Sequence, residues 1–200
     1  MLNIAVLVSG GGTNLQVLLD AQAYGEIVSG RISLVLSSKD GVYALERATQ
    51  ASVKTAVLAK QKDETPAQYG QKLITELLAN DIDMVVLAGF MLILDECFIK
   101  AYEGRILNIH PSLIPAFCGE GFYGLRVHRA ALERGVKLTG ATVHIVNEIP
   151  DGGPILAQKA IEVLDGDTPE ILQQRVMEQA EWILLPRETE KLAASLTKLR

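Results

Sequence analysis

The chain of 200 residues is long enough for one domain with a substantial core, and its composition argues against several classes of protein. Hydrophobic residues make up 48% and charged residues 22%, which is typical of a folded protein rather than a disordered one. The formal net charge is −5, without a block of Lys and Arg. We therefore expect no binding to nucleic acid or to an anionic membrane, because both need clustered basic residues.

The sequence contains no segment that suits a membrane span or a signal peptide. Its longest apolar runs, such as residues 4–8 and 84–88, are far too short to cross a bilayer. A strand pattern begins at Asn3, without the charged and apolar regions of a signal peptide, so we expect a cytoplasmic protein. Cys97 and Cys118 are the only cysteines and are not closely spaced, so neither a disulfide framework nor a structural zinc site is expected.

Strand and helix patterns alternate through the first half of the chain. Apolar strand patterns occupy residues 2–8, 31–37, 53–58 and 83–88, and helical patterns lie between them, beginning near residues 15, 43 and 66. This alternation predicts an α/β fold with a doubly wound, mainly parallel sheet and right-handed crossovers.

The second half predicts one more buried strand, then a loop, a hairpin and a helix. The strand at 105–110 ends at a proline, and residues 116–124 form a long glycine-bearing loop. A helix at 125–134 precedes a C-terminal β-hairpin, with strands at 139–146 and 155–163. A final long helix begins with Thr168 as its cap and the following proline in its first turn. The whole chain, 1–200, is expected to form one domain.

A glycine-rich loop, Ser9–Asn14, follows the first strand directly. Its glycines allow a ligand to approach the backbone, and the free N–H groups at the start of a helix favour an anion such as phosphate. The pattern differs from a dinucleotide fingerprint, because Leu15 stands where the third glycine would be, and it lacks the Walker lysine. The alternative is a tight turn in which Asn14 only caps the helix.

Residues 89–94, after the fourth strand, are too apolar for an ordinary surface turn. They form either a buried bend or the wall of a pocket for a flat organic ring. Their position favours the pocket, because ligands of open α/β sheets bind at the carboxyl ends of the strands.

Three polar residues suggest acyl-transfer chemistry. Asn108 and His110 share a face at the end of a strand, and Asp151 lies in a tight turn ahead of two glycines. The amide would stabilise an oxyanion, the imidazole would supply or relay a proton, and the carboxylate would orient the imidazole or accept a proton. Taken singly, each residue has a local alternative: satisfying loop backbone, filling a strand end, or forming an Asx turn.

Covalent and metal catalysis have little support in the sequence. Ser9 and Ser112 lack the surroundings of a catalytic nucleophile, so direct transfer between two bound substrates is expected. The three histidines are scattered without a close pair, so no metal site is predicted. His128 is expected on a helix surface or in a loop contact, and His144 on a strand near the site.

Four segments resemble, in order, the motifs of the phosphoribosylglycinamide formyltransferases, a group of the formyltransferase family. They are VSGGGTNL at 8–15, LAGFMLIL at 87–94, NIHPSLIP at 108–115 and DGGP at 151–154. The resemblance spans nearly the whole chain and implies a Rossmann-like formyltransferase fold. It also implies direct transfer of a formyl group from 10-formyltetrahydrofolate to the amine of glycinamide ribonucleotide in purine biosynthesis, through a tetrahedral intermediate and without a metal.

Matching motif to motif, the resemblance assigns residue roles. It implies Asn108, His110 and Asp151 as the catalytic residues and Glu181, one position out of register, as a ribonucleotide contact. It implies a phosphate-binding set, Gly11, Gly12, Thr13 and Asn14, and a folate-binding set, Met91, Leu92, Ile93, Leu94 and Asn108. On this basis residues 1–103 form the nucleotide- and phosphate-binding half and residues 104–200 the catalytic and folate-binding half.

The sequence departs from the family pattern at three places. Leu92 and Pro66 stand where many members have arginine, and Lys60 or Lys62 would have to compensate for the second loss. The connection Phe117–Gly124 is longer and richer in glycine than usual, so a different lid over the folate is expected.

The alternatives to glycinamide ribonucleotide formylation are a hydrolase like formyltetrahydrofolate deformylase and a non-catalytic sensor of a phosphate ligand. Chain length disfavours the deformylase and methionyl-tRNA formyltransferase, which have further domains. The expected partners are small-molecule substrates alone, and the protein is expected to be a monomer or a homodimer.

Overall fold

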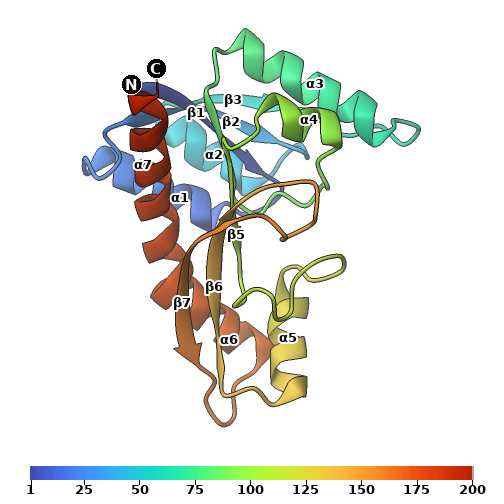
Figure 1. Cartoon of the computed structure of the whole chain (residues 1–200), viewed down its shortest axis with the longest axis vertical. Coiled ribbons are helices and arrows are strands. Elements are labelled where there is room, and N and C mark those ends of the chain that lie inside the picture. The colour runs from blue at the N-terminus through green and yellow to red at the C-terminus, as the bar shows by residue number, and fades with distance from the viewer. Residues whose placement is uncertain (200) are drawn as a thin grey trace.

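Seven strands form one sheet in the order β3-β2-β1-β4-β5-β6-β7 in the computed structural model, which describes residues 1–199 (Figure 1). The first five strands are parallel, and β6 runs antiparallel to both β5 and β7. This arrangement confirms the predicted doubly wound sheet with a C-terminal hairpin. The strands are β1 (Leu2–Val8), β2 (Gly30–Ser37), β3 (Lys54–Val57), β4 (Met84–Leu87), β5 (Ile106–His110), β6 (Leu138–Ile145) and β7 (Ile155–Glu162).

Helices cover both faces of the sheet. They are α1 (Thr13–Ala23), α2 (Tyr43–Gln50), α3 (Pro66–Ala79), α4 (Glu96–Ala101), α5 (Leu125–Arg134), α6 (Pro169–Val176) and α7 (Trp182–Lys198), with one π-helical turn, η1 (Met177–Glu181), between α6 and α7. The prediction missed α4, whose six residues are too few for a periodic pattern; the Asp95 side chain caps it by accepting from the Phe98 and Cys97 N–H groups. No helix within residues 1–199 is long and apolar enough to cross a membrane.

Alternate residues of the strands feed two hydrophobic cores. Along β1, Ile4, Val6 and Val8 pack in the core under α1, α2, α6 and α7, whereas Ala5 and Leu7 pack in the core under α3 and α4. Strands buried on both faces give continuous apolar runs in place of alternation. This explains why the strands of the parallel sheet could be predicted from the sequence to within two residues.

The predicted helix starts at Pro66 and Pro169 are confirmed, whereas the alternative in which Asn14 only caps the first helix is wrong. The Thr65 and Thr168 hydroxyls accept from the N–H groups of Gln68 and Ile171, as N-caps do. In contrast, α1 begins at Thr13, directly after Gly12. Gly12 has a φ of 74°, and a Cβ atom at this position would lie only 2.7 Å from the Ala44 Cβ, so only glycine fits. Asn14 is therefore not a cap, and its side chain is free for other contacts.

The predicted final long helix is not regular. It consists of α6, the π turn η1 and α7 in direct succession, with Pro186 in the first turns of α7. A π turn holds an additional residue per turn and is frequent at functional sites. Here it faces the loop that follows β1.

The strand order reverses direction between β1 and β4. From β1 the chain moves outward to β2 and β3, and it then returns to the other side of β1 to form β4 and β5. Such a switch point leaves a crevice outside the carboxyl ends of the two strands. The glycine loop after β1 and residues 89–94 after β4 flank this crevice.

Candidate active site

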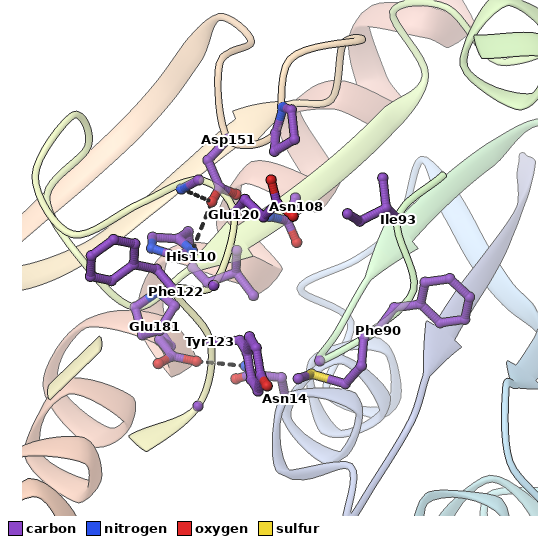
Figure 2. A pocket seen from close by; sticks show the side chains of 18 of the residues that line it. Asn14, Phe90, Ile93, Asn108, His110, Glu120, Phe122, Tyr123, Asp151 and Glu181 are labelled. Atoms are coloured by element: carbon purple, nitrogen blue, oxygen red, sulfur yellow. Dashed lines mark hydrogen bonds and ion pairs between the residues drawn. The ribbon is translucent and has the colours of Figure 1, made fainter. Parts of the chain in front are cut away.

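A cavity of about 570 Å³ opens beside the carboxyl ends of β4 and β5 (Figure 2). Its lining comes from the loop after β4, the end of β5, the loop 119–124, the turn at Pro150 and Asp151, and the segment from α6 to η1. Asn14 lies at one side with Glu181, and Phe90 and Ile93 lie at the other (Figure 2). Segments distant in the sequence therefore build one site.

Asn108, His110 and Asp151, the predicted catalytic residues, meet in this cavity. The Asn108 Nδ2 lies 3.5 Å from Asp151 Oδ1, and the His110 Nδ1 lies 3.4 Å from Asp151 Oδ2. The two β5 residues share the face of the sheet that carries α3 and α4, since the intervening Ile109 packs in the opposite core. Asp151 reaches them from the loop after β6, with a φ of 55°.

The His110 ring is buried and is held at both nitrogens. Its Nε2 lies 2.9 Å from the carbonyl oxygen of Phe117, which only accepts, so Nε2 carries a proton. Burial lowers the pKa of His110, while the charge of Asp151 and the hydrogen bond to Phe117 oppose that shift.

Asp151 is an ionised acceptor at neutral pH. Burial raises its pKa, but the charge of the neighbouring His110 and the hydrogen bond from the Gly119 N–H favour the charged form, and the pKa lies below its ordinary value. The Gly119 N–H donates to Oδ2 at 2.8 Å. The carboxylate thus lies between an imidazole and a loop backbone that both favour its charged form.

His144 was predicted only to lie on a strand near the site, but it contacts one of the three polar residues directly. It is the direct cross-strand partner of Asn108 in the β5–β6 pairing, and the two side chains are 3.0 Å apart. Period-two alternation through 139–146 could have placed His144 on the same face of its strand as Thr142, but its pairing with Asn108 depends on the register of the two strands.

The prediction for His128 was wrong. It expected a helix surface or loop contact, but the side chain is fully buried, and neither ring nitrogen has a hydrogen-bond partner among residues 1–199. Burial, and next the charge of His110, lower its pKa to about 4. The side chain lies on the inner face of α5 because the apolar positions Val127 and Ala131 flank it there.

Three of the four predicted folate-binding residues after β4 line the cavity with Phe90. They are Met91, Leu92 and Ile93, of which Met91 and Ile93 are 45% and 69% exposed, an unusual exposure for large apolar side chains. The fourth, Leu94, instead lines a smaller adjacent cavity of about 140 Å³.

Ser9 holds the wall in place and was not among the predicted site residues. Its buried hydroxyl accepts from the Met91 N–H at 2.9 Å and pairs with the Ser38 hydroxyl at 2.7 Å. The glycine loop after β1 and the apolar wall after β4 are therefore tied together by one side chain.

Of the predicted phosphate-binding residues, only Asn14 lines the cavity. Its Nδ2 donates to Glu181 Oε2 at 2.6 Å, while its Oδ1 is buried without a partner in the part of the chain that the structure describes. The other three, Gly11, Gly12 and Thr13, do not line it, and Arg47 braces their loop by donating from Nε to the Gly11 carbonyl oxygen at 2.9 Å. The glycine loop therefore lies next to the cavity, and only Asn14, just after its glycines, contributes to the lining.

Glu181 is a buried carboxyl with an unusual acidity. Burial raises its pKa to about 7, and the hydrogen bond from Asn14 opposes this rise. Between pH 4.5 and 7 the folded protein therefore holds a proton that the unfolded chain releases, and the free energy of unfolding falls as the pH rises through this window.

We expect the Glu181→Gln variant to show no such fall in the free energy of unfolding between pH 4.5 and 7. The amide keeps an acceptor for Asn14 but carries no charge. Its free energy of unfolding should match that of the original protein below pH 4.5 and exceed it by about 3 kcal/mol above pH 7. Urea unfolding at a series of pH values measures the difference. The exposed Glu178→Gln variant, from the same turn, is the control, and a pH-independent difference for Glu181→Gln would contradict the assignment.

The family model for formyl transferases matches residues 2–188. The chain belongs to the formyl transferase family. It is 42% identical to "Phosphoribosylglycinamide formyltransferase" of Escherichia coli (strain K12) over 178 residues, which cover 89% of this chain and 81% of that protein. It is also 38% identical to the human "Trifunctional purine biosynthetic protein adenosine-3", covering 98% of this chain and 19% of that longer protein.

Solved formyl transferase structures resemble the fold closely. Glycinamide ribonucleotide transformylase 1 from Symbiobacterium toebii aligns with a TM-score of 0.91 at 40% identity, covering 98% of this chain and 89% of that one. Phosphoribosylglycinamide formyltransferase from Bacillus halodurans aligns with a TM-score of 0.87 at 34% identity, covering 99% and 97%.

The loop 117–124 of this formyl transferase contacts the polar residues directly. Phe117 supplies the carbonyl oxygen for His110 from a left-handed conformation, with a φ of 51°, and Gly119 supplies the N–H for Asp151. Phe122 packs edge to face on Phe117, with ring centroids 6.4 Å apart. The conformation of this loop therefore sets the positions of two of the three polar residues.

The cavity of this formyl transferase has an acidic lining. Glu120, Asp151 and Glu181 line it, and no Lys or Arg from residues 1–199 does. Lys60 and Lys62, the predicted substitutes for a missing arginine, are exposed and lie outside the lining. Within the same residues, no cluster of three or more His, Cys, Asp or Glu side chains is arranged to hold a metal.

Proposed function

We propose that this formyl transferase moves the formyl group of 10-formyltetrahydrofolate to the amine of 5′-phosphoribosylglycinamide in de novo purine biosynthesis. One observation carries the proposal: an amide, an imidazole and an ionised carboxylate converge in one cavity, which has an apolar wall on one side and Asn14 with Glu181 on the other. The names of its relatives, phosphoribosylglycinamide formyltransferases at 39–42% identity, support the same substrates.

The two substrates occupy opposite sides of the cavity. The apolar wall of Met91, Leu92 and Ile93 suits the flat ring of a folate, and its exposed side chains gain burial when the ring binds. Asn14 and Glu181 take the ribonucleotide at the other side, where the partnerless Asn14 Oδ1 accepts a donor from it. The phosphate then lies beyond Asn14, against the exposed loop of Gly11, Gly12 and Thr13.

Asn108, His110 and Asp151 act on the reacting groups. The amine nitrogen bonds to the formyl carbon, the bond from that carbon to N10 of the folate breaks, and N10 gains the proton that the amine loses, which passes through Asp151. Asn108 donates an N–H to the formyl oxygen as it becomes negative. The protonated form of His110, which burial disfavours and the charge of Asp151 favours, stabilises the same negative charge. Asp151, ionised at neutral pH, accepts the proton that the amine loses, directly or through a water molecule.

A formyl-transfer assay tests this function. The purified protein is supplied with 10-formyltetrahydrofolate and, in separate reactions, with glycinamide ribonucleotide, with methionyl-tRNA and with no acceptor other than water. We expect formylglycinamide ribonucleotide as the main product. Release of formate at the same rate without any acceptor would show a hydrolase like formyltetrahydrofolate deformylase instead.

The arrangement of the three polar residues disagrees with the alternative of a non-catalytic phosphate sensor. That alternative required Asn108, His110 and Asp151 to lie apart or outside a shared cavity, whereas all three line the same one. A sensor would show ligand binding without any product in the assay.

Three further statements stay predictions. A cytoplasmic location agrees with a biosynthetic enzyme, although two relatives, from Arabidopsis thaliana and Vigna unguiculata, are named as chloroplastic. A monomer or homodimer is expected. We also keep the division of roles between residues 1–103 and 104–200, with the qualification that the apolar wall of the cavity belongs to the first half and Glu181 to the second.

A further inference from the structure

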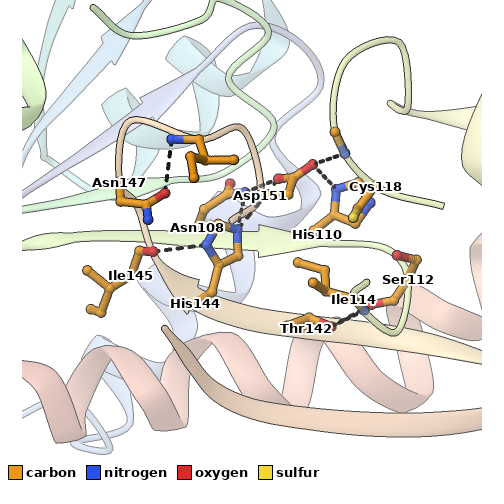
Figure 3. A network of polar contacts seen from close by, with 12 residues as sticks. Asn108, His110, Ser112, Ile114, Cys118, Thr142, His144, Ile145, Asn147 and Asp151 are labelled. Carbon is orange, nitrogen blue, oxygen red and sulfur yellow. Dashed lines mark hydrogen bonds and ion pairs between the residues drawn. The ribbon is translucent and has the colours of Figure 1, made fainter. Parts of the chain in front are cut away.

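His144 is a buried polar residue that the mechanism above does not use. Its side chain is 1% exposed, lies on β6 beside Asn108 (Figure 3), and lines the smaller adjacent cavity together with Leu92 and Ile93. Both ring nitrogens have partners: Nδ1 lies 3.0 Å from the Ile145 carbonyl oxygen, and Nε2 lies 3.0 Å from Asn108 Nδ2. Such a residue has either a packing role or an effect on the Asn108 amide.

The partners fix the tautomer of the ring. A carbonyl oxygen only accepts, so the His144 Nδ1 must carry a proton. In the neutral ring Nε2 is then an acceptor, and it takes an N–H from Asn108. This contact also fixes the amide, because the reversed amide would place its oxygen against the lone pair of Nε2.

The positions of the neighbours leave the second Asn108 N–H available. Asn108 Nδ2 is 3.0 Å from His144 Nε2 and 3.5 Å from Asp151 Oδ1, and these two atoms are 3.6 Å apart, so they subtend an angle of about 67° at the nitrogen. The two N–H bonds of an amide diverge by about 120°. One N–H therefore points at His144, and the other is aligned with neither neighbour.

We propose that His144 is a positioning residue: it accepts one N–H of Asn108 and so fixes the amide with its second N–H available to the formyl oxygen. The proposal rests on the formyl-transfer function and adds a residue to its machinery. His144 touches no substrate in this scheme. Its whole effect on catalysis passes through Asn108.

Two variants separate this role from packing. His144→Leu fills the space without an acceptor and should lower kcat about ten- to a hundredfold while KM stays within twofold, because a buried donor then lacks its partner and the amide can turn. His144→Gln offers an acceptor at nearly the place of Nε2 and should recover most of kcat. Equal losses in the two variants, or an unchanged kcat in His144→Leu, would overturn the proposal.

A double variant tests the route of the effect. If His144 acts through Asn108, then Asn108→Ala/His144→Leu should turn over no more slowly than Asn108→Ala alone. A further loss of tenfold or more in the double variant would assign His144 an independent role and reject the proposal. Ring ¹⁵N shifts of the unmodified protein give a readout that needs no variant: the Nδ1–H tautomer supports the proposal, and the Nε2–H tautomer contradicts it.

These outcomes are distinct from failure of the proposed function. Absence of formyl transfer in the unmodified protein, with every acceptor, would reject the function. The positioning role is judged from the ratios of rates between variants and from the tautomer, in protein that is active.

Discussion

The Asp151→Asn variant should turn over about two to four powers of ten more slowly than the unmodified protein, because it loses the group that accepts the proton of the amine. The carboxylate is ionised at neutral pH, since its polar neighbours outweigh burial and lower its pKa. Asparagine has nearly the same shape and can still accept from the Gly119 N–H, so the loop 117–124 should stay in place. Single-turnover rates with saturating substrates measure the chemical step.

The same variant should also change His110. The charge of Asp151 opposes the effect of burial on the imidazole, so its removal should lower the pKa of His110 further, which an NMR titration of the ring measures. Asp165→Asn, an exposed aspartate in another turn, is the control and should be fully active. An Asp151→Asn protein that retains a tenth or more of the activity would show that the proton leaves by another route.

The Asn108→Ala variant should lose about two to three powers of ten in kcat, the usual effect of removing one donor to an oxyanion. KM should change much less, since the amide interacts with charge that develops only in the transition state. The kcat and KM values for both substrates give this division. Asn108→Asp keeps the size of the side chain but places a carboxylate at the oxyanion, so it should be at least as slow.

A matched control is Asn80→Ala, which removes an asparagine side chain beyond the end of α3 that is hydrogen-bonded to Lys54 and Glu76. It should keep its full activity. If Asn108→Ala is fully active as well, the amide has no part in stabilising the oxyanion, and His110 alone would have to do so.

The sheet was open to prediction because its strands are buried on both faces, which leaves an apolar run for each strand in the sequence. The short helix α4 was not, because it depends on the Asp95 cap and not on a periodic pattern. His128 was misplaced for a related reason: a histidine among polar helix residues reads as exposed, although its neighbours on the same helix face, Val127 and Ala131, pack inward.

The candidate site could be predicted as a set of residues but not as a network. Strand alternation placed Asn108 and His110 on one face, the tight turn ahead of two glycines pointed to Asp151, and the resemblance assigned catalytic roles to all three. The contact of Ser9 with Met91 joins two loops that are far apart in the sequence, and the contact of Phe117 with His110 depends on an irregular loop. No local pattern in the sequence encodes either contact. The same limit hid the role of His144, which depends on the register of two antiparallel strands.

The π turn between α6 and α7 fixes the number of residues that the C-terminal helical segment must contain. Met177 and Glu181, at the two ends of the turn, both line the cavity. Loss of one residue from it would let the helix wind regularly, but each residue on one side would rotate by about 100° around the axis relative to the other side. The Glu181 carboxyl would then leave Asn14, or Pro186 and the rest of α7 would leave their places on the sheet. Insertions and deletions in this stretch should therefore be selected against as strongly as changes of the residues themselves.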